Sequence, residues 1–420
     1  MRRRSVLKAV ALFAMLSLVA AACGDDDDGD ETAATTTTAG ETAETTTTSG
    51  PELTGEPVKV MAIYEKTAGV AVPEIGEGVQ AAVDALNGRG GVQGRPLEYV
   101  ECDTQNDPNT AAECGRQAVS EGVVAIVGSL SVHSGEFMPT LADAGIASIG
   151  LVPAGAADFT SPNAYPIYGG LVTAVAALGR NLVDQGATTL AVVRIDLPAA
   201  AVIANFVNSA LTDKGITVTN DVAVPQGAPD MSTYAAAALE GGVDGVVLGV
   251  TGQDATNFII AAKQANPDIK IALTATDLID ALRSLGDEAT EIYATSGYVQ
   301  ANMDLPAVEQ YLEDMEAAGI TDPSKTFHMN AYASVLLLAE IAEGLATIDA
   351  AGVSATLPTI DGLSIGLTPP LQFVEGGVGG IPRIFNPCQL QLAWDTAEGE
   401  FVAIDGTFID AFSGEACPAP

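Results

Sequence analysis

The chain has 420 residues, of which 48% are hydrophobic and 17% charged, so most of it is expected to fold. Single hydrophobic cores stop growing near about 250–300 residues, and we therefore expect at least two lobes. Acidic residues outnumber basic residues 54 to 17, for a net charge of −37, which argues against a nucleic-acid partner because phosphate binding needs clustered Lys and Arg. Only two histidines are present, so a multi-histidine metal site is nearly excluded, and we expect neither a metal nor a cofactor.

Residues 1–22 have the features of a secretory signal peptide. Three arginines and a lysine precede an apolar run from Ala9 to Ala22, which is shorter than the about 20 residues that a membrane-spanning helix needs. The run closes with Leu-Val-Ala-Ala-Ala-Cys, residues 18–23, which resembles the lipobox of bacterial lipoproteins. By that resemblance Cys23 carries a lipid; an ordinary cleaved signal with an unrelated cysteine is the alternative. Arg3 and Arg4 also resemble part of a twin-arginine signal, so the export route stays open.

Residues 23–56 are expected to form a disordered tether behind the lipidated cysteine. Residues 24–56 contain ten acids, no base and two runs of four threonines. Such a composition buries too little apolar area to offset the entropy of ordering, and its like charges extend it. The four aspartates at 25–28 are a weak candidate for a calcium site, and we favour a solvated spacer.

From Pro57 onward, short apolar runs alternate with segments of helical periodicity. The first series predicts strands at 58–64, 97–101, 123–127 and 147–149, separated by helices at 77–86, 111–120 and 137–144. The second series predicts helices at 174–185, 199–214, 233–239 and 255–264, with strands at 190–195, 216–222, 243–250 and 270–274. Two further helices are predicted at 309–317 and 332–345.

This alternation predicts an α/β protein with two similar Rossmann-like lobes. Parallel strands joined by helices form sheets that are covered on both faces. In open sheets of this kind, ligands bind beyond the carboxyl ends of the strands. The loops that follow strands are therefore the candidate functional segments.

Four cysteines remain if Cys23 is lipidated, and an even number in an exported chain indicates two disulfides. They are Cys102, Cys114, Cys388 and Cys417, which allow three pairings. The most economical pairing joins Cys102 to Cys114 and Cys388 to Cys417, closing two local loops. A catalytic or metal-binding thiol is a weak alternative, because the chain has no Cys-x-x-Cys.

A turn between the first predicted helix and the second strand carries a family resemblance. Residues 81–97 read Ala-Ala-x-x-Ala-Leu-Asn-Gly-Arg-Gly-Gly-Val-Gln-Gly-Arg-Pro-Leu and are followed by Asp103. This segment resembles the signature of periplasmic binding proteins for branched-chain amino acids, and residues 128–131 and 149–154 resemble two further blocks of that family. The resemblance implies a type I periplasmic binding fold, in which two lobes joined by three crossover strands close on a ligand like a Venus flytrap.

The resemblance also implies an activity and a set of partners. The protein would be the extracytoplasmic substrate-binding component of an ABC importer, carrying a branched-chain amino acid or a related amino acid or amide to permease subunits in the membrane. We expect a monomer with no enzymatic activity. By the order of elements, lobe 1 comprises residues 57–170 and 301–367, and lobe 2 comprises residues 171–300 and 368–420.

In the family, the loops after the third and fourth strands hold the ligand carboxylate through backbone N–H groups and hydroxyls, which suit an anion. A Thr or Ser usually stands where this chain has Gly155, so one hydroxyl is missing. The second lobe usually offers an acid to the ligand ammonium, and Asp277 is the nearest match. The predicted ligand-binding residues are Ser131, Val132, His133, Pro153, Ala154, Gly155, Pro198, Thr251 and Asp277.

Three other functions are alternatives to solute transport. Residues 362–366 match the Gly-x-Ser-x-Gly string of Ser hydrolases, but Pro369 and Pro370 block the helix that must follow, and no histidine follows Ser364. The chain has no Walker string with Gly-Lys, which disfavours a nucleotide enzyme. A ligand sensor of the same fold that signals to a membrane partner is the remaining alternative, since fold alone does not separate it from a transport protein.

Overall fold

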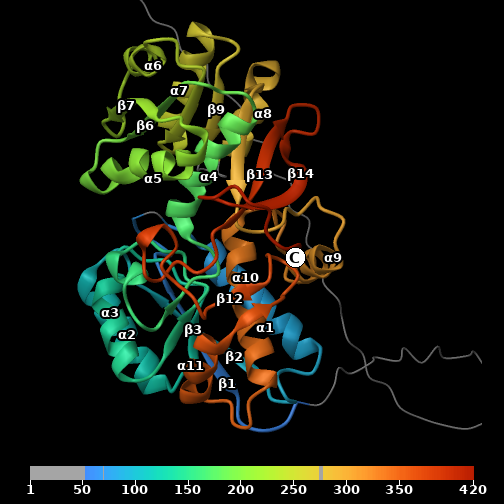
Figure 1. Ribbon diagram of the computed structural model, residues 1–420. Helices are drawn as coiled ribbons and strands as arrows, with labels where there is room; N and C mark the ends of the chain where they lie inside the picture. The colour runs from blue at the N-terminus through green and yellow to red at the C-terminus, as the bar shows by residue number, and fades with distance from the viewer. Residues whose placement is uncertain (1–52, 70, 274–277) are drawn as a thin grey trace, which may run out of the picture. The chain divides into compact units, whose positions relative to one another are not determined.

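The computed structural model describes residues 53–69, 71–273 and 278–420, and Figure 1 shows the two α/β lobes that they form. The predicted signal peptide, Cys23 and most of the predicted tether lie outside the described residues. None of the helices within the described ranges combines the length and apolar character that a membrane span requires.

Lobe 1 is built on a five-stranded parallel sheet in the order β2-β1-β3-β4-β5. Strand β1 (Val58–Tyr64), which pairs with a neighbour on each side, is almost entirely apolar and buried, as expected for a parallel strand covered on both faces. The strands are β1 (Val58–Tyr64), β2 (Leu97–Asp103), β3 (Ala125–Val127), β4 (Ala147–Ile149) and β5 (Ala164–Tyr165). The intervening helices are α1 (Glu74–Gly88), α2 (Pro108–Glu121), α3 (Ser134–Asp143) and the 3-10 turn η1 (Ala156–Phe159).

A later part of the chain returns to lobe 1 and packs on α1. At Gly78 of α1, an added Cβ would lie 2.6 Å from the backbone oxygen of His328, so the absence of a side chain permits close helix packing. Arg89 at the end of α1 pairs with Asp314 at 2.8 Å. The returning elements are α9 (Pro306–Ala317), α10 (Thr326–Glu343), α11 (Ala350–Thr356), η6 (Leu357–Thr359), β11 (Asp361–Leu363) and β12 (Leu371–Gln372).

Lobe 2 contains a seven-stranded sheet in the order β14-β13-β10-β9-β8-β6-β7. The pairs from β7 to β10 are parallel, whereas β13 and β14 form an antiparallel hairpin on the β10 edge. The strands are β6 (Leu190–Ile195), β7 (Val218–Val224), β8 (Gly245–Gly249), β9 (Lys270–Leu273), β10 (Ile292–Ser296), β13 (Cys388–Asp395) and β14 (Glu400–Asp410). The helices are α4 (Gly170–Asp184), α5 (Ile203–Ala210), α6 (Ser232–Leu239), α7 (Gly252–Ala265) and α8 (Ile279–Leu285), with short 3-10 turns at η2 (Pro198–Val202), η3 (Thr212–Lys214) and η5 (Gly286–Ala289). A further 3-10 turn, η7 (Val378–Gly380), lies between β12 and β13.

The predicted fold class is confirmed: both lobes have a sheet of parallel strands with covering helices, and the second sheet is mostly parallel. The helix predicted at 199–214 is instead divided into η2, α5 and η3. The Thr212 hydroxyl donates to the backbone oxygens of Asn208 and Ser209, a local bond that competes with regular helix at this end. The structure contains the disulfides Cys102–Cys114 and Cys388–Cys417, the pairing that closes two local loops.

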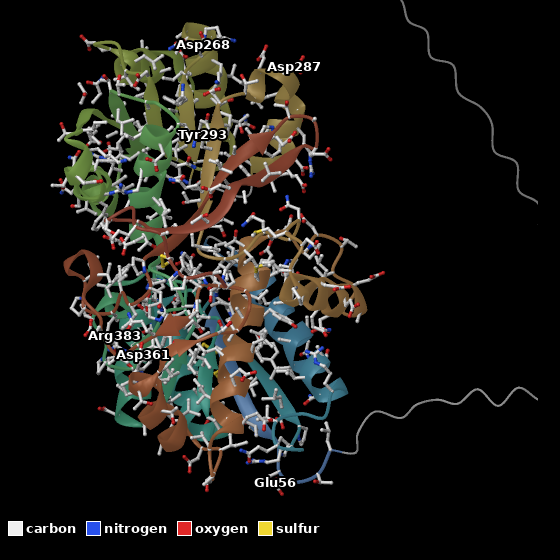
Figure 2. The ribbon with its side chains drawn as sticks, turned by 45° about the vertical axis from the view of Figure 1, so that its right-hand side comes forward. Glu56, Asp268, Asp287, Tyr293, Asp361 and Arg383 are labelled. Carbon is white, nitrogen blue, oxygen red and sulfur yellow. A yellow bond between two sulfur atoms is a disulfide. The ribbon has the colours of Figure 1, made fainter. Side chains whose placement is uncertain are left out.

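The chain passes between elements of the two sheets three times, at 166–169, 297–305 and 373–387. The second passage is tied to lobe 1 because the Tyr298 hydroxyl donates to Oδ1 of Asn330 in α10 at 2.6 Å. The third is held by Arg383, labelled in Figure 2, whose guanidinium lies 4.5 Å from the Tyr165 ring centroid and whose Nε donates to the Ala164 oxygen. The lobe boundaries given above stay a prediction.

Candidate functional site

The loops after β3 and β4 are placed by glycines at the strand ends. Gly128 and Gly150 both have φ of +62°, a conformation that side chains disfavour, and each turns the chain out of its strand. A Cβ on Gly150 would lie 1.9 Å from Oγ of Ser334, so α10 packs directly under this loop. Asn330 of α10, fully buried, donates from Nδ2 to the Gly150 oxygen at 2.9 Å. The two loops therefore rest on one helix at the carboxyl edge of the sheet.

The loop after β3 binds a carboxylate of the protein itself. Glu65 directly follows β1 and is only 2% exposed. Its Oε1 accepts a hydrogen bond from the Ser131 hydroxyl at 2.8 Å and one from the backbone N–H of Val132 at 3.2 Å. Ser131 in turn accepts from the His133 backbone N–H at 3.1 Å. The predicted hydroxyl of this loop is thus turned toward Glu65.

The loop after β4 binds a second internal carboxylate, that of Asp158 in η1. This side chain is 2% exposed, and its Oδ2 accepts from the backbone N–H groups of Ala154 at 2.9 Å and Gly155 at 2.8 Å. Burial raises the pKa of Asp158 to about 6, and the charge of Glu65 adds to the rise, while the backbone donors act in the opposite direction. The two N–H groups predicted to face a ligand are therefore occupied.

Position 155 has little room for a side chain, which favours glycine there. Its φ of −95° is open to any residue, but an added Cβ would lie 2.2 Å from Oγ of Ser134 and 3.1 Å from the Val132 oxygen. Ser134 is 1% exposed, and within the described residues its hydroxyl makes no hydrogen bond of normal geometry, although it is near enough to Asp158 to oppose the rise in pKa. Ser134 occupies the space that a Thr or Ser at position 155 would fill.

The other predicted residues of lobe 1 have more ordinary surroundings. Val132 is 56% exposed beside the Glu65 contact. His133 is partly buried, and its Nε2 faces the backbone oxygen of Asn106 at 3.2 Å. Pro153 is buried and lies against Gly170, where a Cβ would meet its ring at 3.0 Å. The structure therefore brings Ser131, Val132, Ala154 and Gly155 together around two carboxylates, with Val132 as the apolar surface.

The loops at the carboxyl edge of the second sheet combine polar and apolar side chains. Pro198 begins η2 after β6, and Thr251 is the exposed N-cap of α7 but makes no capping hydrogen bond with its side chain. Leu197 and Val202 near the end of β6 are exposed large hydrophobic residues. Asp277, predicted to meet a ligand ammonium, lies outside the described residues.

Glu65, Asp158 and Ser134 were missed by the sequence reasoning. Glu65 follows an apolar strand directly, so the rule that singled out the loops after β3 and β4 applies to it equally. Asp158 lies three residues beyond Gly155, the spacing at which a carboxylate can reach back to backbone N–H groups. Nothing in the sequence pattern distinguishes Ser134 from an ordinary helix-start serine.

A separate cavity of about 620 Å³ lies in lobe 1 between α1, β2 and the segment before α10. Four of its charged or titratable groups form two pairs: Lys66 with Glu101 at 2.6 Å and His328 with Glu77 at 2.8 Å. None of the predicted ligand-binding residues lines it. In the ranges that the structure describes, no group of His, Cys, Asp or Glu is arranged to hold a metal ion.

Comparison with known proteins identifies the family. The periplasmic binding protein family model matches residues 57–376. The chain therefore belongs to the periplasmic binding protein family, whose members bind substrates outside the cytoplasm. No curated protein matches the chain in sequence.

Solved structures of the type I class share the fold at low sequence identity. The branched-chain amino acid transporter substrate binding protein LivJ from Streptococcus pneumoniae, in complex with isoleucine, is 17% identical with a TM-score of 0.66, covering 83% of this chain and 98% of that one. An ABC transporter solute binding protein from R. palustris, in complex with 4-hydroxybenzoate, is 16% identical with a TM-score of 0.67, covering 83% and 95%. A fatty acid ABC transporter substrate-binding protein from Thermomonospora curvata is 18% identical with a TM-score of 0.68, covering 84% and 93%. Ligands therefore differ widely within this fold.

The raised pKa of Asp158 predicts a defined pH dependence of stability. The folded protein binds the Asp158 proton more readily than the unfolded chain, whose pKa lies near 3.8, so the contribution of this group is full below that pH and is lost as pH rises through about 6. Asp158→Asn cannot ionise, and its free energy of unfolding relative to the parent should increase by about 2 kcal/mol between pH 4 and pH 7. Urea unfolding across this range measures the difference.

Asp107→Asn is the matched control for that experiment. The Asp107 carboxyl caps α2, and hydrogen bonds led by the Thr110 backbone N–H lower its pKa. Its contribution is therefore present above the unfolded pKa and lost as pH falls, the opposite sign to Asp158. An Asp158→Asn difference that stays constant from pH 4 to pH 7 would contradict the account of this carboxyl.

Proposed function

We propose that this protein is the extracytoplasmic substrate-binding component of an ABC importer. It captures a small polar solute of the amino-acid or amide class between its lobes and delivers it to permease subunits, without transforming it. The match of the family model over residues 57–376 is the observation that carries the proposal. The relatives of known structure whose names include an ABC transporter or a transporter substrate-binding protein support the same role.

The proposed site is formed by the carboxyl edges of the two sheets. In lobe 1 it comprises residues 131–133 and 153–155, supported on α10, and in lobe 2 it comprises Pro198, Thr251 and Asp277. The exposed apolar side chains of Val132, Leu197 and Val202 at these edges support contact with the apolar part of a solute. Closure of the lobes on the solute shifts a population of conformers, since a ligand that touches both lobes binds the closed form more tightly.

Recovery of a bound solute tests this function. Protein purified from its native host, denatured and analysed by mass spectrometry should release a small molecule. When that molecule is added back, calorimetry should give a dissociation constant of about 1 μM, equivalent to a binding free energy of about −8 kcal/mol. Small-angle scattering should show a smaller radius of gyration at saturation. An unchanged radius, or chemical conversion of the solute by the protein, would contradict the proposal.

Ser131→Ala should weaken binding of the recovered solute by about ten-fold, because the hydroxyl holds both Glu65 and the His133 backbone N–H in place. Ser354→Ala is the matched control: its hydroxyl donates to the Gly145 oxygen, at the opposite end of α3 from residue 134, and its loss should leave the affinity unchanged. Equal affinities of the two variants would refute the assignment of Ser131 to the site.

We also propose that Cys23 carries the lipid anchor and that the acidic segment after it acts as the tether, up to Thr54 and Glu56, which are hydrogen-bonded to Gly94 and Arg95 of lobe 1. The lipobox-like sequence at 18–23 supports this. Several acyl chains hold a protein at a membrane because each buried methylene contributes about 0.8 kcal/mol. Mass spectrometry of membrane-fraction protein should find an acylated Cys23, and Cys23→Ala should move the protein to the soluble fraction. An unmodified residue 23 in membrane-bound protein would refute the anchor.

A further inference from the structure

The backbone donors of lobe 1 are already used by the protein's own acids. The loop after β3 gives one hydroxyl and one N–H group to Glu65, and the loop after β4 gives two N–H groups to Asp158. A carboxylate binds strongly only where several such donors converge on it. A ligand carboxylate that reached these loops would have to displace Glu65 or Asp158 from a buried position, leaving that acid without its hydrogen bonds.

No basic residue offsets these acids. Among the described residues, neither Glu65 nor Asp158 forms an ion pair with a Lys, Arg or His. The nearest base in sequence, Lys66, pairs with Glu101, and the His133 ring faces a backbone oxygen. A third negative charge at this edge would therefore meet repulsion in a poorly screened environment.

The local packing also leaves position 155 without a donor side chain. Ser134 fills the space beside Gly155, where an added Cβ would lie 2.2 Å from its Oγ, and the Ser134 hydroxyl is itself near Asp158. In contrast, an acceptor is left over. In the described part of the chain, Oε2 of Glu65 accepts no hydrogen bond and is not among the buried polar atoms that lack a partner, so it keeps contact with solvent. This oxygen is therefore accessible to a ligand group that donates a hydrogen bond.

We propose that Glu65 and Asp158 set the ligand class of this site: the ligand presents an N–H donor group, an amide or an ammonium, to lobe 1 and has no carboxylate there. The exposed Val132 beside Glu65 contacts the apolar body next to that group. This inference rests on the proposed solute-binding function and narrows it to amides and amines.

Matched pairs of small molecules that share an apolar body test the inference in the parent protein. The pairs are isovalerate and isovaleramide, benzoate and benzamide, octanoate and octanamide, and leucine and leucinamide. Calorimetry should show at least one amide that binds ten-fold or more tightly than its carboxylate partner. A panel in which no amide is preferred, including one in which nothing binds, overturns the inference.

Asp158→Ala frees the N–H groups of Ala154 and Gly155, and it should shift the ratio of carboxylate to amide affinity toward the carboxylate by about ten-fold. Asp158→Asn keeps an acceptor oxygen but removes the charge, so it should shift the ratio in the same direction by less and provides the test if the Ala variant fails to fold. Asp349→Ala is the control, because this carboxylate also caps backbone N–H, at Gly352 of α11, away from the site. Ratios that are unchanged in both folded Asp158 variants overturn the inference.

The identity of the solute recovered from the protein shows whether the assigned ligand class, the proposed function or both are wrong. A recovered carboxylate that contacts lobe 1 would overturn the assigned ligand class and leave solute transport in place. A recovered amide or amine supports both the ligand class and the transport function. Protein that yields no solute from its native host and binds no compound of the panel counts against both.

Discussion

Asp158 and Glu65 stay buried because donors from two loops hydrogen-bond to them, and this constraint organises the carboxyl edge of the first sheet. Each carboxylate would be costly at 2% exposure without such bonds. Asp158 joins η1 to the loop after β4, and Glu65 joins the end of β1 to the loop after β3. The acids therefore act first as structural clamps that hold the loops, and their effect on a ligand follows from that role.

Helix α10 holds the loop after β4 in place through direct contacts with Gly150. Gly150 approaches Ser334 so closely that no side chain fits, and Asn330 bonds to its carbonyl oxygen. The same Asn330 accepts from Tyr298, which lies on the second passage between the sheets. One buried amide thus links that passage directly to the loop after β4.

The fold was predictable because its signal is repeated. Strand-length apolar runs alternate with helical periods throughout residues 57–274, and the glycine-rich turn at 87–94 carries the family resemblance. The β13–β14 hairpin was not anticipated, since an edge hairpin has no alternating helix to mark it. The segments after β3 and β4 were also predicted correctly to be loops that follow strands, but their hydrogen bonds were not, because a sequence does not show that Asp158 folds back onto Ala154 and Gly155.

In lobe 1 the backbone donors of the two loops are taken up by Glu65 and Asp158, whereas Oε2 of Glu65 accepts no hydrogen bond from the described residues. The central claim is that the N–H groups of Ala154 and Gly155 belong to Asp158. Amide resonances of these two residues, followed by NMR from pH 4 to pH 8, test it most directly. The account predicts that both amide resonances shift together with a midpoint at a pH of about 6, which is the pKa of Asp158. It also predicts that Asp158→Asn abolishes this shift. Amides that do not respond to pH in the parent protein would contradict it.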